Sequence, residues 1–266
     1  MKLARYRALL VGATGGIGSA IAHALAPHCD TLLLVGRNAE GLDALASAIG
    51  PAGSVACVAA DIGTVSGRAD VLDGVRRQGG IDLLVNCAGT GAFGWLADQS
   101  EASIDAIVAI NLVAPMQLVR GLLPILEAQP ASTIVNVGSI FGYLGYPGCA
   151  AYSASKFGLR GFTEALRREL AGGRVRVAYL APRSTRTRLN SDAMYALNES
   201  LGVAVDEPEV VAQALLRLLS TPRRERLLGF PEALFARLNQ LVPGLVDKAL
   251  ARQLPQIRRH ARGDHR

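Results

Sequence analysis

Residues 8–18 read Ala-Leu-Leu-Val-Gly-Ala-Thr-Gly-Gly-Ile-Gly, an apolar run that leads into a glycine-rich turn. The apolar residues predict a short buried strand, and helical periodicity begins at Ile17. A turn of this kind lets backbone N–H groups at the start of a helix approach a pyrophosphate, which a Cβ atom would block. Because a strand precedes the turn and a helix follows it, the pattern favours a dinucleotide-binding turn over an ordinary tight turn.

The alternation of strand and helix continues over the N-terminal two thirds of the chain. The expected buried strands are Ala8 to Val11, Thr31 to Val35, Ser54 to Ala59, Leu83 to Asn86, Thr133 to Val137 and Val175 to Leu180. The expected helices are Ile17 to Leu25, Ala39 to Ile49, Ser66 to Gln78, Glu101 to Leu126 and Ala150 to Ala171. Repeated strand-helix-strand units predict an α/β fold with a doubly wound parallel sheet, the Rossmann fold.

The pattern changes after residue 180. A polar segment, Arg183 to Ser191, is followed by a helix starting near Asp206, where Asp206 and Glu209 have the spacing of a capping box. A seventh strand is expected at Arg226 to Leu228. We therefore expect a single domain, with residues 1–229 as its dinucleotide-binding and catalytic part and residues 230–266 as a helical C-terminal extension.

The amino-acid composition excludes several classes of protein. The chain has 266 residues, half of them hydrophobic and 19% charged, with a mean hydropathy of +0.27, which excludes intrinsic disorder. The longest apolar stretch, Ile107 to Leu126, is interrupted by polar residues and prolines, so no membrane-spanning helix is expected. The apolar run after the N-terminal basic residues is too short for a signal peptide, and we expect a cytoplasmic protein. The four cysteines and four histidines have no metal-binding spacing, so neither a disulfide nor a metal is expected.

The net charge of +6 comes entirely from the C-terminal segment. Residues 1–221 contain 18 basic and 18 acidic side chains, whereas residues 222–266 contain 10 basic and 4 acidic ones. Since the main body is neutral and no basic stripe is interleaved with aromatic residues, we expect no nucleic-acid partner.

Two side chains near the second and third strands bear on the choice of cofactor. Folds that prefer NAD usually carry Asp or Glu at the end of the second strand, whereas an Arg there accommodates the 2′-phosphate of NADP. Here the acid is missing and Arg37 is present, which favours NADP(H), although a solvated arginine is the alternative. Asp61 could accept a hydrogen bond from the adenine amino group or cap the turn that follows it.

The segment Tyr152-Ser-Ala-Ser-Lys156 opens an expected helix, with Ser139 shortly before it. Spacing of four residues places Tyr152 and Lys156 on one helix face. A tyrosine with an ordinary pKa of about 10 is a poor acid or base at neutral pH, and a neighbouring ammonium is expected to lower that pKa. Such a tyrosine can exchange a proton with a substrate oxygen.

In these features the sequence resembles the short-chain dehydrogenase/reductases, in their single-domain form, over about residues 6–230. The resemblance rests on the glycine turn, on Asn86-Cys-Ala-Gly89, on Asn111, on Ser139 with Tyr152 and Lys156, and on Thr187 after Pro182. It implies that Tyr152 is the general acid or base, that Ser139 orients the substrate oxygen, and that Lys156 binds the nicotinamide ribose and lowers the Tyr152 pKa. It further implies that Asn111 holds a water linked to the lysine. Thr187 would contact the nicotinamide amide.

The expected catalytic residues are therefore Asn111, Ser139, Tyr152 and Lys156. The expected cofactor-binding residues are Gly12, Thr14, Gly15, Gly16, Ile17, Gly18, Arg37, Asp61, Ile62, Asn86, Ala88, Gly89, Tyr152, Lys156, Pro182, Thr185 and Thr187. The sequence departs from the usual family pattern at Val11, where a threonine is common, at Cys87, where an asparagine is common, and at Arg183, where a glycine is common. Arg183 puts the local backbone path in doubt, or supplies a second cation near the cofactor phosphates.

These residues predict an NADP(H)-dependent oxidoreductase that interconverts a carbonyl and an alcohol. The alternative is a protein that binds NADP as a sensor or scaffold without turnover. Aromatic residues in the loops after the fourth and fifth strands suggest an apolar substrate, although they could equally be packing residues: Phe93, Trp95, Phe141, Tyr143 and Tyr146. By resemblance we expect a homodimer or homotetramer formed through the helices at 101–126 and 150–171.

The C-terminal segment from Phe230 to Arg266 lies beyond the shared motifs. Phe230, Leu234, Leu238, Leu241 and Leu245 form an apolar stripe broken by Pro243-Gly244, with basic residues around it. Packing on the sheet or on a second subunit is the favoured interpretation. A lid over the substrate crevice is the next alternative, and association with an anionic membrane surface is possible but not favoured.

Overall fold

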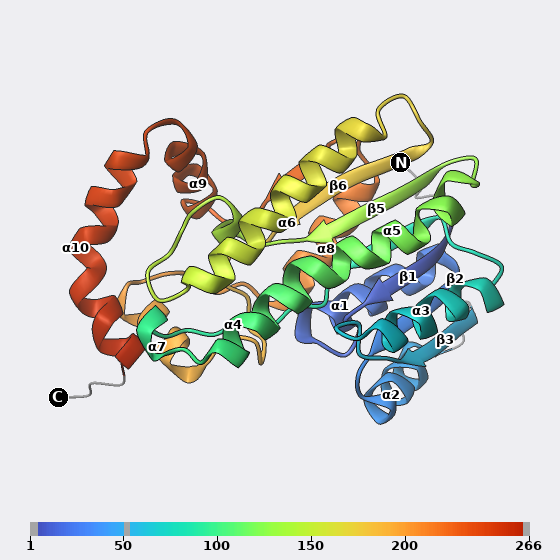
Figure 1. Cartoon of the computed structure of the whole chain (residues 1–266), viewed down its shortest axis with the longest axis horizontal. Helices are drawn as coiled ribbons and strands as arrows, with labels where there is room; N and C mark the ends of the chain where they lie inside the picture. Colours follow the sequence, from blue (N-terminus) through green and yellow to red (C-terminus); the bar gives the residue numbers. More distant parts are fainter. Residues whose placement is uncertain (1–4, 51–53, 263–266) are drawn as a thin grey trace.

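The structure is a computed structural model that describes residues 5–50 and 54–262. Within these residues, seven parallel strands form one sheet in the order β3-β2-β1-β4-β5-β6-β7 (Figure 1). The strands are β1 (Tyr6–Val11), β2 (Cys29–Gly36), β3 (Ser54–Ala59), β4 (Leu83–Asn86), β5 (Ser132–Val137), β6 (Val175–Ala181) and β7 (Glu225–Leu227). The doubly wound parallel sheet is thus confirmed. The strand order reverses between β1 and β4, where such folds open a binding crevice at the carboxyl ends of the strands.

Helices cover both faces of the sheet and extend beyond one end of it. They are α1 (Gly16–Leu25), α2 (Ala39–Ile49), α3 (Val65–Arg77), α4 (Glu101–Val108), α5 (Ala114–Glu127), α6 (Ala150–Glu169), α7 (Asp192–Ser200), α8 (Pro208–Leu219), α9 (Glu232–Leu241) and α10 (Pro243–Arg262). One face packs on α1, α2 and α8, and the other on α3, α5 and α6, in two buried apolar clusters. The result is a three-layer α/β domain, and the central strands are buried on both faces because helices cover both, whereas the edge strands β3 and β7 are only partly buried.

The helix between β4 and β5 contains an irregular turn. A π-helical turn (Ala109–Val113) joins α4 to α5, and it carries the fully buried Asn111. Turns of this kind often mark functional sites. By length and composition alone, the continuous segment Glu101–Glu127 could cross a membrane, a test that core helices of soluble proteins also pass. Leu118, Leu122 and Leu126 on this segment pack into the sheet, so it is a core helix here.

The C-terminal third differs from the expectation. Helix α7 lies between the polar segment 183–191 and the helix expected near Asp206, where the sequence predicts no helix. Its N-terminus is capped by Ser191, whose Oγ accepts from Met194 N. The expected capping box at Asp206 is wrong, because α8 begins at Pro208 and Asp206 accepts a hydrogen bond from Arg183 instead. The expected helical C-terminal extension consists of two helices, α9 and the longer α10, and α10 packs against α7 and α9, away from the sheet (Figure 1).

Candidate active site

The glycine turn after β1 is built by close backbone approach. Gly12 has a φ of +87°, and a Cβ atom on it would lie 2.5 Å from the backbone nitrogen of Ala88 after β4. A Cβ on Gly18 would collide with the Gly12 carbonyl oxygen. The start of α1 at Gly15 and Gly16 has no side-chain cap and no acidic residue in its first turn, so its N–H groups are open to an anion. The turn therefore fits the pyrophosphate of a dinucleotide.

The end of β2 lies beside this turn. The side chain of Thr14 packs over Gly36 and Gly41, which bracket the β2–α2 connection. Arg37 is exposed there, and no hydrogen bond or ion pair involves its guanidinium within residues 5–50 and 54–262. Asn38 next to it caps α2 by accepting from Gly41 N at 3.1 Å. A guanidinium at the end of β2 that forms no ion pair among the described residues could bind a cofactor phosphate.

Two other predicted cofactor residues follow β3. One carboxylate oxygen of Asp61 accepts from Gly63 N at 2.9 Å, so Asp61 does cap the turn, as the plainer of its two interpretations predicts. Its side chain remains exposed, whereas Ile62 is buried against α3 and the sheet. Ile62 can therefore meet a cofactor only through its backbone.

A buried polar chain runs from the end of β4 across the sheet. Asn86 Nδ2 donates to Asn136 Oδ1 at 2.8 Å, and Asn136 Nδ2 donates to Thr163 Oγ1 at 2.8 Å. The Asn86 side chain is thus committed to the neighbouring strand and enclosed. Only the backbone of Asn86 can therefore contact a cofactor. Ala88 lies against the glycine turn, and Gly89 lines the crevice.

Tyr152 and Lys156 lie on one face of α6, as predicted, and Ser139 lies at the end of β5. Lys156 Nζ is 5.7 Å from the centroid of the Tyr152 ring and donates to Val137 O at 3.3 Å. Asn111 Oδ1 accepts from Thr90 N at 2.8 Å, while its Nδ2 donates to Thr90 O and to Ser155 Oγ. Asn111 thereby joins the loop after β4 to α6. Both of its amide hydrogens are used, so the water expected from the resemblance has only acceptor positions left on this residue.

The expected lowering of the Tyr152 pKa is wrong, because the structure indicates a shift in the opposite direction. Burial raises the pKa of Tyr152 to about 12, although its hydrogen bond with Ser139 acts in the opposite direction. Burial also lowers the pKa of Lys156 to about 8, and the neighbouring Cys87 partly offsets that effect. Desolvation outweighs the attraction of the two groups because both are enclosed.

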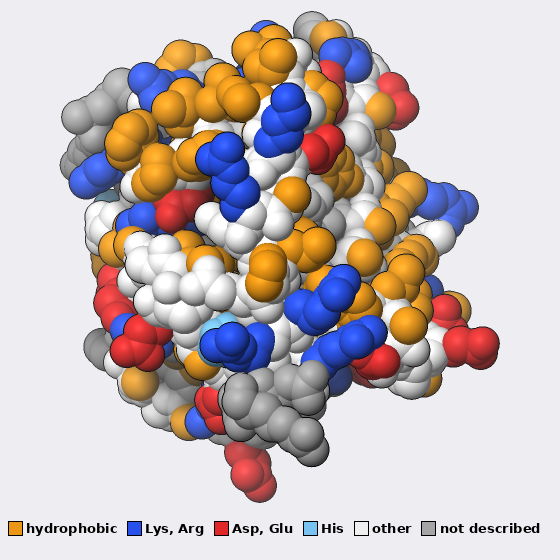
Figure 2. All heavy atoms as spheres, turned by 90° about the vertical axis from the view of Figure 1, so that its left-hand side faces the viewer, with side chains coloured by type: hydrophobic (Ala, Val, Ile, Leu, Met, Phe, Trp, Pro, Cys, Tyr) orange, Lys and Arg blue, Asp and Glu red, His pale blue; other side chains and the backbone are white. Residues whose placement is uncertain are grey.

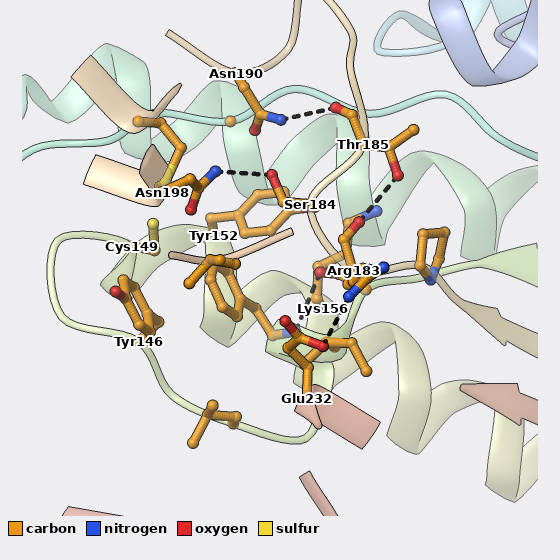
Figure 3. A pocket seen from close by; sticks show the side chains of 18 of the residues that line it. Tyr146, Cys149, Tyr152, Lys156, Arg183, Ser184, Thr185, Asn190, Asn198 and Glu232 are labelled. Carbon is orange, nitrogen blue, oxygen red and sulfur yellow. Dashed lines mark hydrogen bonds and ion pairs between the residues drawn. The ribbon is translucent and has the colours of Figure 1, made fainter. Parts of the chain in front are cut away.

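The loop after β6 is where the chain departs most from the family pattern. Arg183 donates from one terminal nitrogen to Asp206 Oδ1 at 2.7 Å. Its other terminal nitrogen donates to Glu232 Oε2 at 3.2 Å (Figure 3). Its side chain is only 16% exposed. The interpretation of Arg183 as a cation for the cofactor phosphates is therefore corrected, because two carboxylates already occupy it. Arg183 instead links the β6 loop to the segment before α8 and to α9.

The remaining predicted residues of this loop lie at the glycine turn or beneath the loop. Thr187 lies against the glycine turn, since a Cβ on Gly16 would be 2.8 Å from its Cγ2. Tyr195 Oη accepts from Thr187 N and lies 2.8 Å from Thr187 O, so α7 holds the loop in place. Pro182 and Thr185 are buried beneath it, and Thr185 Oγ1 donates to Arg183 O.

A cavity of about 440 Å³ connects these parts. It reaches from Ile17 and Thr187 at the glycine turn, past Ser139, Tyr152 and Lys156, to α7, α9 and α10 (Figure 3). Its outer wall comes from Met194, Asn198, Leu201, Phe235, Val246 and Leu250. The part from α9 and α10 agrees with the alternative that places the C-terminal segment over the crevice, whereas the part from α7 was not predicted. The Ser191 cap and the periodic pattern of 192–200 were the signal that could have revealed α7.

The structure divides the aromatic residues into two groups. Phe93, Phe141 and Tyr146 line the cavity, and the last two stack with ring centroids 4.8 Å apart. Tyr143 is a packing residue whose hydroxyl hydrogen-bonds Glu225. Trp95 lies under α10, with the Arg258 guanidinium 5.4 Å from its ring centroid.

The cysteines and acidic residues suggest no further chemistry in the part of the chain that the structure describes. All four cysteines are free, and burial raises the pKa of Cys87 and of Cys149 to about 12, which keeps both thiols protonated. No three His, Cys, Asp or Glu side chains among the described residues are grouped to hold a metal ion.

Known proteins share this arrangement. The family model described as short chain dehydrogenase matches residues 6–196. "Carbonyl reductase family member 4" from Xenopus laevis is 34% identical over 214 residues, which is 79% of this chain and 89% of that protein. A short chain dehydrogenase/reductase from Burkholderia phymatum, solved with NAD, superposes with a TM-score of 0.81 at 25% identity, over 92% of this chain and 96% of that one. A short-chain dehydrogenase from Sphingobium yanoikuyae, solved with NADPH, gives a TM-score of 0.76 at 25% identity, over 90% and 94% of the two chains.

The match extends over most of the chain and includes the turn, the crevice and the Tyr152–Lys156 pair. With this fold and site, the chain belongs to the short-chain dehydrogenase/reductase family of nicotinamide-dependent oxidoreductases.

Proposed function

We propose that the protein is an NADP(H)-dependent reductase of small apolar carbonyl compounds. The proposal rests on the observation that the same cavity is lined by Ser139, Tyr152 and Lys156 and also reaches the glycine turn. A substrate carbonyl in that cavity lies within reach of a proton donor and of the cofactor site at once.

Each side chain of the site has a separate task. Tyr152 donates a proton to the substrate oxygen, and its raised pKa keeps the hydroxyl protonated at neutral pH. Ser139 hydrogen-bonds the same oxygen and fixes its position. Lys156 binds the nicotinamide ribose, and Asn111 holds the loop at Thr90 against α6. When bound, the cofactor supplies the hydride.

NADP(H) is proposed over NAD(H) because of the corner at the end of β2. Arg37 is exposed beside Thr14, and no acidic side chain follows β2 before the start of α2. A 2′-phosphate would gain a charge-assisted hydrogen bond there, whereas a ribose 2′-hydroxyl would find no carboxylate.

The substrate is proposed to be apolar because most of the cavity wall is apolar. The stacked pair Phe141 and Tyr146 forms one side, and Met194, Leu201 and Leu250 form the other. Polar side chains on this wall are in part paired with the protein: Asn198 donates to Ser184 Oγ at 2.9 Å, and Glu232 accepts from Arg183 at 3.2 Å. A carbonyl compound with an aliphatic or aromatic body suits such a wall.

We further propose a homodimer or homotetramer formed through α4–α5 and α6. Three exposed apolar side chains lie on the π-helical turn, α5 and α6, namely Val113, Met116 and Phe157. Helix α6 contacts the π-helical turn, so these side chains belong to neighbouring elements that a second copy could cover together.

The experiment is a panel of aliphatic and aromatic aldehydes and ketones, with consumption of NADPH or NADH followed by absorbance. We expect turnover with apolar members of the panel and a higher kcat/KM with NADPH than with NADH. If NADPH binds tightly but no compound is reduced, the protein is a non-catalytic cofactor-binding protein and the proposal is wrong.

A further inference from the structure

The segment from residue 230 to the start of α10 exposes apolar side chains that do not pack in the interior of the fold. We call Phe230, Leu234, Leu241, Val242 and Leu245 the tail face. Phe230 is 79% exposed, Leu241 80% and Leu245 59%. Scattered exposed apolar residues are normal on a protein surface, but these five fall within sixteen residues, from the segment before α9 to the start of α10.

The inner sides of the same helices are already packed. Ala236 on α9 and Val246 and Ile257 on α10 are buried. Leu234 and Leu241 are seven residues apart, two helical turns, so they share a face of α9. The stripe therefore does not pack on the sheet within this chain: Leu234, Leu241 and Leu245 are exposed and Leu238 is half-buried.

Basic side chains lie next to the tail face. Lys248, Arg252 and Arg259 follow spacings of four and seven along α10, and all three are exposed without an ion pair among the described residues. Asp247 is exposed next to Lys248 and is the one acidic residue of α10, so basic side chains outnumber acidic ones on this helix. Figure 2 shows this side of the molecule, with apolar side chains gathered over its upper part and Lys and Arg side chains between and below them.

The tail face is continuous with the wall of the cavity. Phe235 on α9 and Val246, Ala249 and Leu250 on α10 line the cavity from the inside. The same two helices thus present apolar side chains to the cavity on one side and to solvent on the other. An apolar compound held at the outer surface would be adjacent to the wall of the site.

We propose that α9 and α10 dock on an anionic lipid bilayer, with the tail face in the interfacial region and the α10 cations over the headgroups, and that the apolar carbonyl substrates are taken from that bilayer. Apolar side chains beside exposed cations are the combination that binds such surfaces. Pro243-Gly244 does not weaken this arrangement, because α9 and α10 contact each other and present one surface. The substrate part rests on the proposed function, whereas the docking part does not.

A second copy of the chain is a poorer occupant of this surface. A symmetric contact would place the same face of each copy against the other. Such a contact would need acidic side chains opposite Lys248, Arg252 and Arg259, and α10 offers Asp247 as its one acidic residue. An anionic bilayer satisfies both the apolar and the basic part.

The test is co-sedimentation of the full chain with vesicles of phosphatidylcholine, with and without phosphatidylserine, at low and high salt. We expect binding to the mixed vesicles at low salt, and weaker binding at high salt or without phosphatidylserine. Leu241→Glu and the double variant Arg252→Glu with Arg259→Glu should each weaken binding by about tenfold or more.

Matched controls separate the surface from general effects. Val65→Glu changes a side chain that is 78% exposed on α3, and Arg77→Glu with Arg174→Glu removes the same charge at exposed positions elsewhere. Both should bind vesicles as the wild type does. Equal binding by Leu241→Glu and wild type, or no binding to the mixed vesicles at low salt, would overturn the proposal, as would a loss of dimer in Leu241→Glu at unchanged vesicle binding.

The two proposals can fail separately. NADPH binding and reduction of a short water-soluble carbonyl without vesicles should be the same in wild type and in all these variants. Vesicle binding without any turnover would overturn the proposed function alone. Turnover without vesicle binding would overturn the docking alone.

Discussion

Residues 5–182 and residues 183–262 form the active site in different ways. In the first region the cofactor turn and the catalytic groups are fixed by backbone geometry, as at Gly12, where a Cβ would lie 2.5 Å from Ala88 N. In the second region the site is a wall of side chains on α7, α9 and α10 around the same cavity. Chemistry is thus encoded by positions that tolerate little change, and substrate choice by packing that can vary.

The two regions meet at Arg183. Its guanidinium belongs to the loop after β6, and its partners Asp206 and Glu232 belong to the C-terminal region. We call Arg183 with Asp206 and Glu232 the seam. Variants in the first region should change the reaction rate or the cofactor preference, whereas variants at the seam should change stability and substrate affinity.

The largest effect is expected at Tyr152. Tyr152→Phe removes the proton donor while the ring keeps its edge contact with Phe141, so turnover should fall on the order of a hundredfold to ten-thousandfold with NADPH affinity nearly unchanged. Steady-state kinetics and NADPH fluorescence titration measure the two quantities. Tyr146→Phe is the matched control, because its ring also lines the cavity, and it should keep most of the rate. Substantial activity in Tyr152→Phe would show that the proton comes from elsewhere.

The next effect concerns the cofactor corner of the first region. Arg37→Asp removes the partner of a 2′-phosphate and adds an acceptor for a ribose hydroxyl. A charge-assisted bond of this kind is worth about 1.5–3 kcal/mol, so the ratio of NADPH to NADH affinity should shift about tenfold to a hundredfold toward NADH. Arg77→Asp, on the exposed side of α3, should leave the ratio as it is. An unchanged ratio in Arg37→Asp would mean that Arg37 is a solvated surface residue.

The sequence predicted the first region well because its signals are local. Apolar runs in β1 to β6 and the glycine turn have a direct physical cause in burial on both faces and in close backbone approach. The second region depends on contacts between distant residues. Asp206 has the spacing of a capping residue, yet a guanidinium 23 positions earlier competes for its carboxylate. The leucine spacing of the tail likewise identified an amphipathic helix, but spacing alone does not say which side faces the protein.

The pKa of Tyr152 shows the same limit within the catalytic set. The spacing of Tyr152 and Lys156 predicted their shared helix face, which the structure confirms. The direction of the pKa shift depends on how completely surrounding elements enclose the two groups, and that enclosure comes from both regions.

A smaller effect is expected at the seam between the regions. Arg183→Ala leaves Asp206 and Glu232 partly buried without their cation, which should lower the free energy of unfolding by about 2–3 kcal/mol. Because Glu232 lines the cavity, substrate KM should also rise, by about tenfold, with NADPH affinity less affected. Arg186→Ala is the matched control: its ion pair with Glu207 is exposed, so neither quantity should change. If Arg183→Ala and Arg186→Ala changed the free energy of unfolding and the substrate KM equally, the ion pairs of Arg183 would have no special role in holding the two regions together.

The smallest effect is the pH dependence of cofactor binding. Burial lowers the pKa of Lys156 from 10.5 to about 8, so its ammonium is present below about pH 8 and is lost above it. NADPH affinity should therefore fall severalfold between about pH 7 and pH 9, while Tyr152 and Cys87, with pKa values raised to about 12, stay protonated. Lys156→Met should bind NADPH more weakly at pH 7 and show a flat profile.

Stability should move in the opposite direction over the same pH range, and this makes the assignment to Lys156 specific. In the unfolded chain the lysine keeps its ordinary pKa of 10.5, so between about pH 8 and pH 10.5 the unfolded state holds a proton that the folded state has lost. The free energy of unfolding of cofactor-free wild type, relative to Lys156→Met, should therefore rise with pH in this window while NADPH affinity falls. Chemical denaturation and NADPH titration at the same series of pH values measure both. If the two quantities fell together, general alkaline destabilisation of the fold would account for the loss of binding, and the buried ammonium would not.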